Sequence, residues 1–448
     1  MESPRPHFAR AHVDSTDKFS SAFLTGRRTY AQQFDQLYYK RLQHLKPHIL
    51  AHAHQKWGSQ AQLTASVLNV DSSLGTTYII GTVFIDSPRK PSTLQQVESE
   101  HRVSDPVVTQ GYRGADEAVF LEDESGRIRL MGEQISKTLL ISGVVAAVLG
   151  VETAAGDFEV ADVCFAGMPP QLGPLRIMED PGADSDADPL LMLVSGLGAT
   201  LARPITLQMQ LLGELLSGTL GATRTQQLAA RIAHVVVAGN TMDLPTAPLG
   251  HAEDARTNDR SGAARLAAQV DDFLADIAGC VPLTVMPGAR DPADASLPQQ
   301  PMPRGMFAQC ARTSAFRSLS NPASMQIGGL QMLGSSGQNV DDLMRYAAGD
   351  GAVTPCALAA LSLTWRHIAP SAPDTLWCFP FITHDPFVLD TAPHVYFVAN
   401  QGAFESTWAL GTEGQRTLVM AIPSFAQTGQ VVLLNMRTLS CSVLHIEL

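Results

Sequence analysis

Two kinds of hydrophobic pattern divide this chain of 448 residues. Apolar side chains recur at helical spacing from about residue 29 to residue 46, which predicts an amphipathic helix before Pro47 disturbs the pattern. Residues 1–22 are polar, contain proline and lack periodicity, so we expect them to be disordered. Residues 23–58 are therefore assigned to an N-terminal helical segment.

Short β patterns follow between about residues 60 and 170. The expected strands are 76–85, 118–121, 127–130, 141–149 and 158–165. The acidic break at 122–126 predicts a hairpin turn between two of them. So many short strands in one stretch predict a small closed barrel of the OB type, assigned to residues 59–175.

The rest of the chain alternates apolar runs with helical patterns. An acidic stretch with proline and glycine marks a linker at 176–189, and a polar stretch at 246–262 is expected to be a surface insertion. The expected strands are 190–194, 232–238, 283–286, 395–398, 416–421 and 431–435, with helices to about 216 and over 263–277. Residues 190–448 are therefore predicted to form an α/β sandwich, so the fold class is α/β plus all-β.

Composition excludes several classes of protein. The formal net charge is −12, with 31 Lys and Arg against 43 Asp and Glu, so the average surface repels a phosphate backbone. The six cysteines lie far apart without zinc spacing, which favours a reducing compartment. No stretch has the ~20 apolar residues of a membrane span, and the N-terminus does not resemble a signal peptide. We expect a soluble intracellular protein without a membrane partner.

Several ordered short motifs resemble the regulatory second subunit, of the B-family, in eukaryotic DNA polymerase delta. The motifs are VSGLG at 194–198, VMPG at 285–288, LPQQP at 297–301, SNP at 320–322, LGSSGQNVDD at 333–342 and RHIAPSAPDTL at 366–376, with further likeness at 30–42 and 156–167. The resemblance extends from about residue 23 to the C-terminus. It implies a calcineurin-like phosphodiesterase sandwich that is inactive, preceded by an OB-fold barrel.

The resemblance also implies a function and partners. The chain would be a non-catalytic scaffold in DNA replication and repair, located in the nucleus. It would hold the C-terminal metal-binding domain of the catalytic subunit and the third, clamp-interacting subunit. It would meet DNA and the sliding clamp only through that complex, and it could be shared with the translesion polymerase zeta. An iron–sulfur cluster would belong to the catalytic subunit, so no cofactor is expected here.

The framework is also similar to the small subunit of archaeal D-family polymerase, which in that family is a metal-dependent exonuclease. By this comparison, the eight metal-ligand positions correspond to Gly196, Gly198, Asn240, Ala289, Arg290, Ser336, Gln401 and Ala403. A pair of divalent ions requires carboxylate and imidazole ligands, which these side chains do not supply, and Arg290 would place a positive charge in the pocket. We therefore expect no catalytic and no metal site.

Other candidate residues have competing interpretations. Asp243 and Asp291 follow the ligand positions, where we expect a structural role in orienting loops. His44, His48 and His52 have spacing that can bind zinc, but an exposed polar helix end is the favoured interpretation because no further ligand lies nearby.

The remaining candidates concern phosphate and single-stranded DNA. The loop at 334–339 could cradle a phosphate but lacks a lysine, and it is interpreted as the relic of a metal loop. Tyr78, Phe84 and Phe120 are expected in the barrel core, and Arg89 and Lys90 form the only close basic pair nearby, so DNA binding by the barrel is disfavoured. An active phosphoesterase with substitute ligands, a DNA-binding barrel and the equivalent subunit of another polymerase stay open as alternatives.

Overall fold

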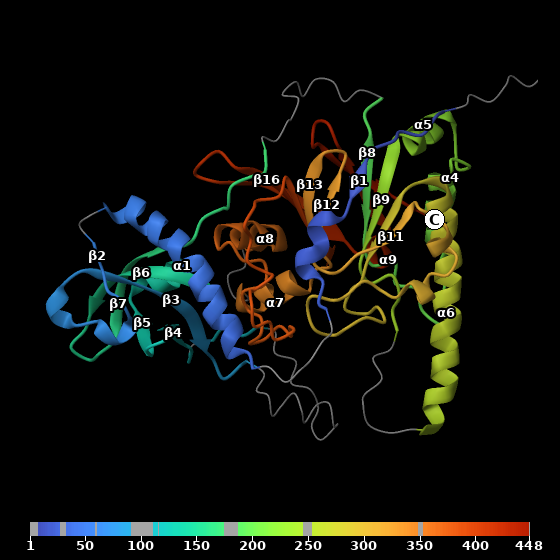
Figure 1. Ribbon diagram of the computed structural model, residues 1–448. Coiled ribbons are helices and arrows are strands. Elements are labelled where there is room, and N and C mark those ends of the chain that lie inside the picture. Colours follow the sequence, from blue (N-terminus) through green and yellow to red (C-terminus); the bar gives the residue numbers. More distant parts are fainter. Residues whose placement is uncertain are drawn as a thin grey trace, which may run out of the picture.

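The computed structural model describes residues 8–26, 33–58, 61–90, 111–114, 116–173, 187–244, 253–347 and 353–447. A barrel and a two-sheet sandwich lie side by side, with helix α1 (Asp35–Trp57) against the barrel (Figure 1). Among the described residues, no helix is both long and apolar enough to cross a bilayer.

Most strands of the barrel sheet close into a ring. The sheet contains β2 (Gln62–Leu63), β3 (Thr77–Asp86), β4 (Ala118–Glu122), β5 (Arg127–Met131), β6 (Val145–Glu152) and β7 (Phe158–Cys164), and α3 (Glu133–Lys137) follows β5. The order is β2-β3-β4-β5-β7-β6, and β3 also pairs with β6, which closes the ring. Thr82 pairs with both Glu122 and Val145, so β3 belongs to both sides of the closure. The predicted strands and the closed barrel are confirmed.

Pro47 does not interrupt helix α1, although the sequence pattern predicted that it would. The helix continues through Pro47 to Trp57, whereas residues 29–32 lie outside the described residues. Its apolar face is buried over its whole length, from Leu37 through Leu45 to Ala53. Proline removes one backbone donor, but packing of this face against β3 and β6 stabilises the helix on both sides of it.

The N-terminus is also ordered where disorder was expected. Strand β1 (Ser15–Thr16) pairs with β12 (Ala323–Ile327), and a 3-10 helix spans Lys18–Phe23. The guanidinium of Arg10 donates to the carbonyls of Ala229 and Ile232 at 3.0 Å each. The prediction is therefore wrong for residues 8–22, because distant backbone groups order a segment that has no periodicity of its own; residues 1–7 lie outside the described residues.

Two six-stranded sheets form the sandwich. One has the order β11-β10-β9-β8-β17-β18 and the other has the order β1-β12-β13-β14-β16-β15. Their strands are β8 (Leu190–Val194), β9 (Ile232–Ala238), β10 (Leu283–Met286), β11 (Phe316–Ser318), β13 (Leu330–Ser335), β14 (Val395–Gln401), β15 (Glu405–Leu410), β16 (Arg416–Pro423), β17 (Gln430–Asn435) and β18 (Cys441–His445). All six strands predicted for this domain are confirmed.

Alternate residues of the central strands face different cores. Leu191 and Leu193 of β8 pack between the two sheets, whereas Met192 faces a core on the outer side. The helices α4 (Leu207–Ser217), α5 (Thr223–Arg231) and α6 (Glu253–Cys280) follow the first sheet's strands, and α4 and α6 cover its outer face. The second sheet carries α7 (Gln338–Ala347) and α8 (Pro355–Thr364), and the short α9 (Phe425–Thr428) follows β16. The result is a four-layer α/β/β/α arrangement (Figure 1).

The polar stretch at 246–262 differs from the expected insertion. Helix α6 already begins at Glu253, so the second half of this stretch is helical, and residues 245–252 lie outside the described residues. Most of the acidic linker, residues 174–186, lies outside them too.

A buried arginine connects the barrel to the sandwich. Arg41 of α1 donates to Asp385 at 2.7 Å, and to the carbonyls of Gly143, Pro370 and Ala372 at 3.2, 2.7 and 2.6 Å. Both members of the ion pair are fully buried. One side chain thus joins α1, the loop before β6 and a loop of the sandwich domain.

Candidate functional site

The residues that the sequence analysis predicted at metal-ligand positions lie at one edge of the sandwich. The strands β8, β9 and β10 run parallel, as do β13 and β14, so their carboxyl ends meet at the same edge. The side-chain amide of Asn400 donates to the carbonyls of Ala238 and Ser336 at 3.2 and 2.8 Å, which joins the two sheets there. This cluster of strand ends is called the vestigial centre below.

Most of the predicted positions come together in this centre. The amide N–H of Gly198 donates to the carbonyl of Asn240 at 3.0 Å, and the side-chain oxygen of Asn240 accepts from the N–H of Arg290 at 3.0 Å. Gln401 donates to Asp341 at 3.1 Å and to the carbonyl of Ala399 at 3.0 Å. Ala289 and Ala403 are exposed in the loops that follow β10 and β14.

The glycines leave no room for metal-binding side chains. A Cβ atom on Gly196 would lie 2.5 Å from the Ser424 hydroxyl and 2.8 Å from the Asn400 side-chain oxygen. A Cβ atom on Gly198 would lie 2.9 Å from the Cβ atom of Ala426. Both glycines have φ near +60°, which disfavours any side chain. Placing an aspartate and a histidine at these two positions would require the neighbouring loop to move.

Neutral amides fill the adjoining space. Asn321 donates to the side-chain oxygens of Gln299 and Gln338 at 2.8 and 2.9 Å, and it accepts from the backbone N–H of Ser336 at 2.9 Å. Gln299 in turn donates to the carbonyl of Gly288 at 3.1 Å. The sequence analysis did not predict this amide network, because its members are separated along the chain and do not form a recognisable motif.

The donor atoms present do not fit a pair of divalent ions. Among the residues that the structure describes, three buried oxygens at this edge have no hydrogen-bond partner, namely the hydroxyls of Ser336 and Thr241 and the side-chain oxygen of Asn400. All three are neutral, whereas hard divalent ions require carboxylates to offset their charge. In the part of the chain that the structure describes, no three His, Cys, Asp or Glu side chains are grouped so that they could hold a metal ion.

The carboxylates of Asp291 and Asp243 both interact with neighbouring loops. Asp291 accepts from the backbone N–H groups of Met242 and Gly288, both at 2.8 Å, which is the loop-orienting role expected of it. Asp243 pairs with Arg290 at 2.6 Å, and Arg290 is 62% exposed. Burial raises the pKa of Asp291 to about 7, although the backbone donors oppose that shift.

This raised pKa makes stability depend on pH. Asp291 binds a proton in the folded state up to about pH 7, whereas the unfolded chain releases it near the ordinary pKa of 3.8. The stabilising contribution is therefore complete below the unfolded pKa and is lost as pH rises through the folded pKa. We expect the free energy of unfolding of the wild type to fall by about 2–3 kcal/mol between pH 5 and 8 through this group.

The Asp291→Asn variant isolates the effect. The asparagine side chain cannot titrate, so the free energy of unfolding of the variant should fall less between pH 5 and 8, by about the amount given above. The variant should also be less stable overall, because one backbone donor loses its acceptor. Urea unfolding at several pH values measures the difference, with Asp243→Asn as the control. Parallel pH profiles for the wild type and Asp291→Asn would contradict the assignment.

The three histidines at 44, 48 and 52 have different surroundings. His44 lies 2.8 Å from Asp390, and both side chains are substantially exposed. Its ring is 6.4 Å from that of His48, whose pKa is lowered by burial and by Arg366. His52 instead packs against Gly167, where an added Cβ would lie 2.0 Å from its ring.

The loop at 334–339 has few free donors for a phosphate. The N–H of Ser336 donates to Asn321, and the N–H of Gly337 donates to the Ser335 hydroxyl at 3.2 Å. These backbone N–H groups of the loop therefore already donate to other groups within the protein.

The barrel aromatics are only partly in the core. Tyr78 is buried as expected, but Phe84 and Phe120 are half-buried, so the prediction is wrong for those two residues. Phe84 shares its face of β3 with Tyr78 and Ile80, which are buried, so the alternation of the strand alone did not predict that Phe84 is half-exposed. Arg89 donates to the carbonyl of Arg113 at 2.8 Å, and Lys90 pairs with Asp374 at 2.5 Å.

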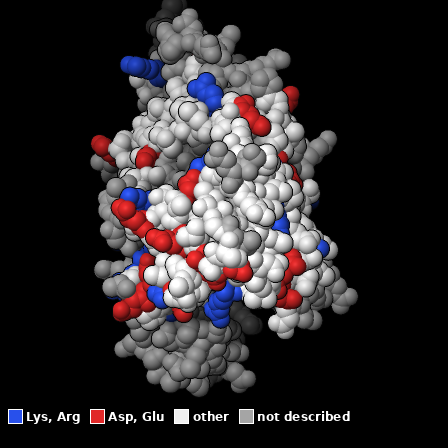
Figure 2. Space-filling view, turned by 90° about the vertical axis from the view of Figure 1, so that its left-hand side faces the viewer, with Lys and Arg blue, Asp and Glu red and all other residues white. Residues whose placement is uncertain are grey.

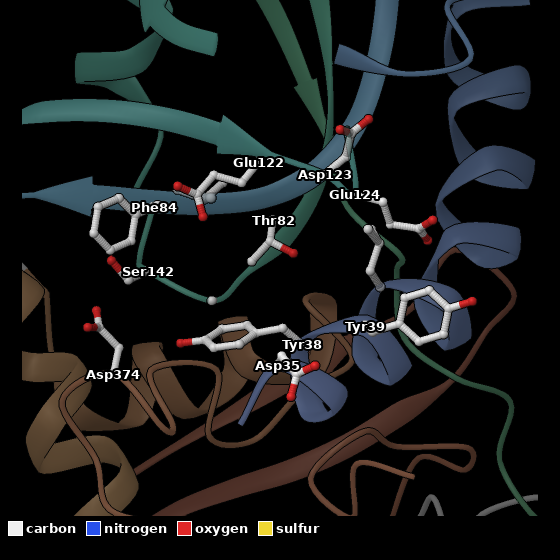
Figure 3. Close-up of a pocket in the computed structure, with 13 residues that line it drawn as sticks. Asp35, Tyr38, Tyr39, Thr82, Phe84, Glu122, Asp123, Glu124, Ser142 and Asp374 are labelled. Carbon is white, nitrogen blue, oxygen red and sulfur yellow. The ribbon is translucent and has the colours of Figure 1, made fainter. Parts of the chain in front are cut away.

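A cavity of about 430 Å³ opens between α1 and the barrel. Its labelled residues come from α1, β3, the end of β4 with the turn that follows it, the loop before β6 and a sandwich loop, and the side chain of Tyr38 extends across the cavity toward Asp374 (Figure 3). We call this cavity the acidic pocket, and its charged and aromatic lining residues are Asp35, Tyr38, Tyr39, Phe84, Glu122, Asp123, Glu124 and Asp374. Sequence reasoning missed this pocket because its parts are far apart along the chain.

Comparisons with known proteins cover both domains. A family described as the B-subunit of DNA polymerase alpha/epsilon matches residues 191–406, within the sandwich. A family described as DNA polymerase delta subunit OB-fold domain matches residues 33–163, which include α1 and the barrel strands up to Val163. The OB-type barrel predicted from the strand pattern is confirmed by this match.

Full-length relatives are similar along nearly the whole chain. The chain is 39% identical over 415 residues to the DNA polymerase delta small subunit of Arabidopsis thaliana, covering 92% of this chain and 91% of that protein. It is 35% identical over 421 residues to the small subunit of Oryza sativa subsp. japonica, covering 94% of each. It is 34% identical over 437 residues to DNA polymerase delta subunit 2 of Drosophila melanogaster, covering 96% of each.

Proposed function

This chain belongs to the family of DNA polymerase delta small subunits and is an accessory subunit of that polymerase, and from this premise we propose that it acts as a non-catalytic scaffold. The observation that carries the proposal is the vestigial centre. Its strand ends bear glycine, amide and hydroxyl groups where two-metal catalysis needs carboxylates and imidazoles.

The proposal includes the type of fold. We propose that residues 190–448 form a calcineurin-like phosphodiesterase sandwich that has lost its ligand set. The four-layer order of helices and sheets and the strand ends grouped at one edge support it. A rigid sandwich joined to a barrel through Arg41 presents a preformed surface, so little conformational entropy is lost when a partner binds.

The proposed partners are the C-terminal metal-binding domain of the catalytic subunit and the third, clamp-interacting subunit. The chain would bridge them in the nucleus, and the catalytic subunit of polymerase zeta is a further proposed partner. DNA would be contacted through the assembly, because the net charge of −12 disfavours independent binding.

Loss of catalysis is tested on the purified chain. We expect no hydrolysis of a generic phosphodiester with excess Mn²⁺, and no stoichiometric bound metal by elemental analysis. Activity that copurifies with bound metal and is lost in Asn240→Ala would contradict the proposal, because Asn240 lies at the vestigial centre.

The Asp243→Asn variant tests whether surviving carboxylates matter. It breaks a pair with an exposed arginine, so the free energy of unfolding should fall by less than about 1 kcal/mol. Copurification with the catalytic subunit should be unchanged. A variant that folds normally but loses the catalytic subunit would show that Asp243 has a functional role.

A further inference from the structure

We propose that the acidic pocket accepts a lysine or arginine side chain from another subunit of the polymerase; this inference rests on the proposed scaffold function. The pocket combines apolar side chains, aromatic rings and carboxylates on one side of the barrel. That combination suits a cation on a flexible apolar stem.

The charged groups that line the cavity are acidic. Five carboxylates line it, and no lysine or arginine is among the described residues of its lining. Two of the carboxylates are engaged: Asp123 holds the β4–β5 turn by accepting from the N–H groups of Ser125 and Gly126, and Asp374 pairs with Lys90.

Three carboxylates remain, and of these Glu122 alone has a basic partner among the described residues. Asp35 accepts a neutral hydrogen bond from Gln36, at 3.1 Å, and Glu124 is exposed at the tip of the turn. Glu122 lies 3.8 Å from Arg127 in an exposed pair. Burial raises the pKa of Glu122, and Asp374 adds to that shift while Arg127 and Lys90 oppose it. A further cation in the pocket would offset this unfavourable burial of charge.

The chain itself shows how a cation is held at one end of the pocket. The ammonium group of Lys90 lies 4.6 Å from the centroid of Phe84 and 2.5 Å from Asp374. The ring of Tyr38 likewise faces the guanidinium of Arg41, at 5.4 Å. Tyr39 and Glu124, which lie on the side of the cavity farther from Asp374 in Figure 3, offer a further pairing of ring and carboxylate. An incoming lysine or arginine would repeat an arrangement that this fold already stabilises.

A lysine or arginine side chain of a protein fits the pocket better than a nucleic acid does. Figure 2, which faces the barrel side, shows acidic side chains over the middle and lower part of this face with some basic ones among them, and the net charge of −12 disfavours a nucleic-acid backbone. At about 430 Å³ the pocket is at the lower end of the ~300–1,000 Å³ range of small-ligand sites, so it suits one long side chain with its neighbours. An accessory subunit, moreover, has partner subunits to supply that side chain.

The test uses the full chain and measures its affinity for the purified catalytic subunit and for the third subunit, each at low and high salt. In the double variant Glu122→Gln/Glu124→Gln, we expect binding of the subunit that uses the pocket to weaken about tenfold, with a shallower salt dependence. The control Glu133→Gln/Glu214→Gln removes two exposed carboxylates outside the pocket and should bind like the wild type. Glu124→Lys, at an exposed position, should weaken binding further without affecting folding.

The possible outcomes distinguish failure of the pocket proposal from failure of the proposed scaffold function. If the subunits bind the pocket variants and the control equally well, the pocket inference is overturned and the scaffold function stands. A loss of affinity that is the same at every salt concentration would also overturn it, because the proposed attraction is electrostatic. If the wild-type chain binds neither subunit, both proposals fail.

Discussion

Replacing Arg41 with alanine is expected to reduce the free energy of unfolding by about 3–5 kcal/mol, the cost of breaking a buried ion pair. The substitution leaves Asp385 buried without its cation and removes donors from three carbonyl groups. Because these acceptors belong to both domains, the barrel and the sandwich should also lose their cooperative unfolding. Denaturant titration followed by domain-specific tryptophan fluorescence measures both effects.

The pH dependence of Arg41→Ala provides a second readout. The ring of His367 lies 2.8 Å from the carboxylate of Asp385, and burial together with Arg41 lowers the pKa of His367 to about 4. Without Arg41, His367 can take a proton and neutralise Asp385 more readily. The stability deficit of the variant should therefore shrink as pH falls from 7 to about 5.

Lys46→Ala is the matched control for Arg41→Ala. Lys46 lies on the same helix and is exposed, so its substitution should change stability by less than about 0.5 kcal/mol. An effect of Arg41→Ala no larger than that of Lys46→Ala would show that the buried connection does not hold the domains together.

Substituting Gly143 with alanine is expected to cost about 2–5 kcal/mol through backbone strain and overpacking. Gly143 has φ +86°, and an added Cβ would lie 1.8 Å from the carbonyl oxygen of Pro370 and 2.8 Å from Arg41. The barrel loop and the sandwich loop cannot both keep their positions. Thermal or denaturant unfolding of the variant measures the loss.

The Gly156→Ala variant distinguishes the cost of backbone strain from the cost of a steric clash at Gly143. Gly156 has nearly the same φ, +85°, but nothing lies within 4 Å of its added Cβ. This control should cost only about 1–2 kcal/mol, the penalty of a left-handed conformation alone. Equal losses for the two alanine variants would contradict a close approach at Gly143.

The two junction substitutions should not be additive. Arg41 donates to the carbonyl of Gly143, so each substitution already disrupts the contact that the other would remove. The double variant should be less destabilised than the sum of the two single variants.

The sequence predicted the central strands because burial fixes their pattern. Strand β8 is apolar at every position since it is covered on both faces, and β9 is apolar at all but His234. Strand β11 is three residues long and β1 only two, so neither produces a pattern that periodicity can detect. Pairing with a distant neighbour determines these strands.

The sequence showed that Gly196 and Asn240 carry no carboxylate or imidazole, but it did not show why a larger side chain could not be accommodated there. The closeness of Ser424 to Gly196 is a property of the fold. The acidic pocket was missed because Tyr38, Phe84 and Asp374 meet only when the barrel, α1 and the sandwich pack together.

The mass of the assembly formed with and without this chain tests the scaffold account most directly. The C-terminal domain of the catalytic subunit and the third subunit would be coexpressed, purified and measured by light scattering. The account predicts a single complex with one copy of each protein when this chain is present, and separate species when it is absent. A stable complex of the other two subunits that forms without this chain, or one that excludes it, would contradict the account.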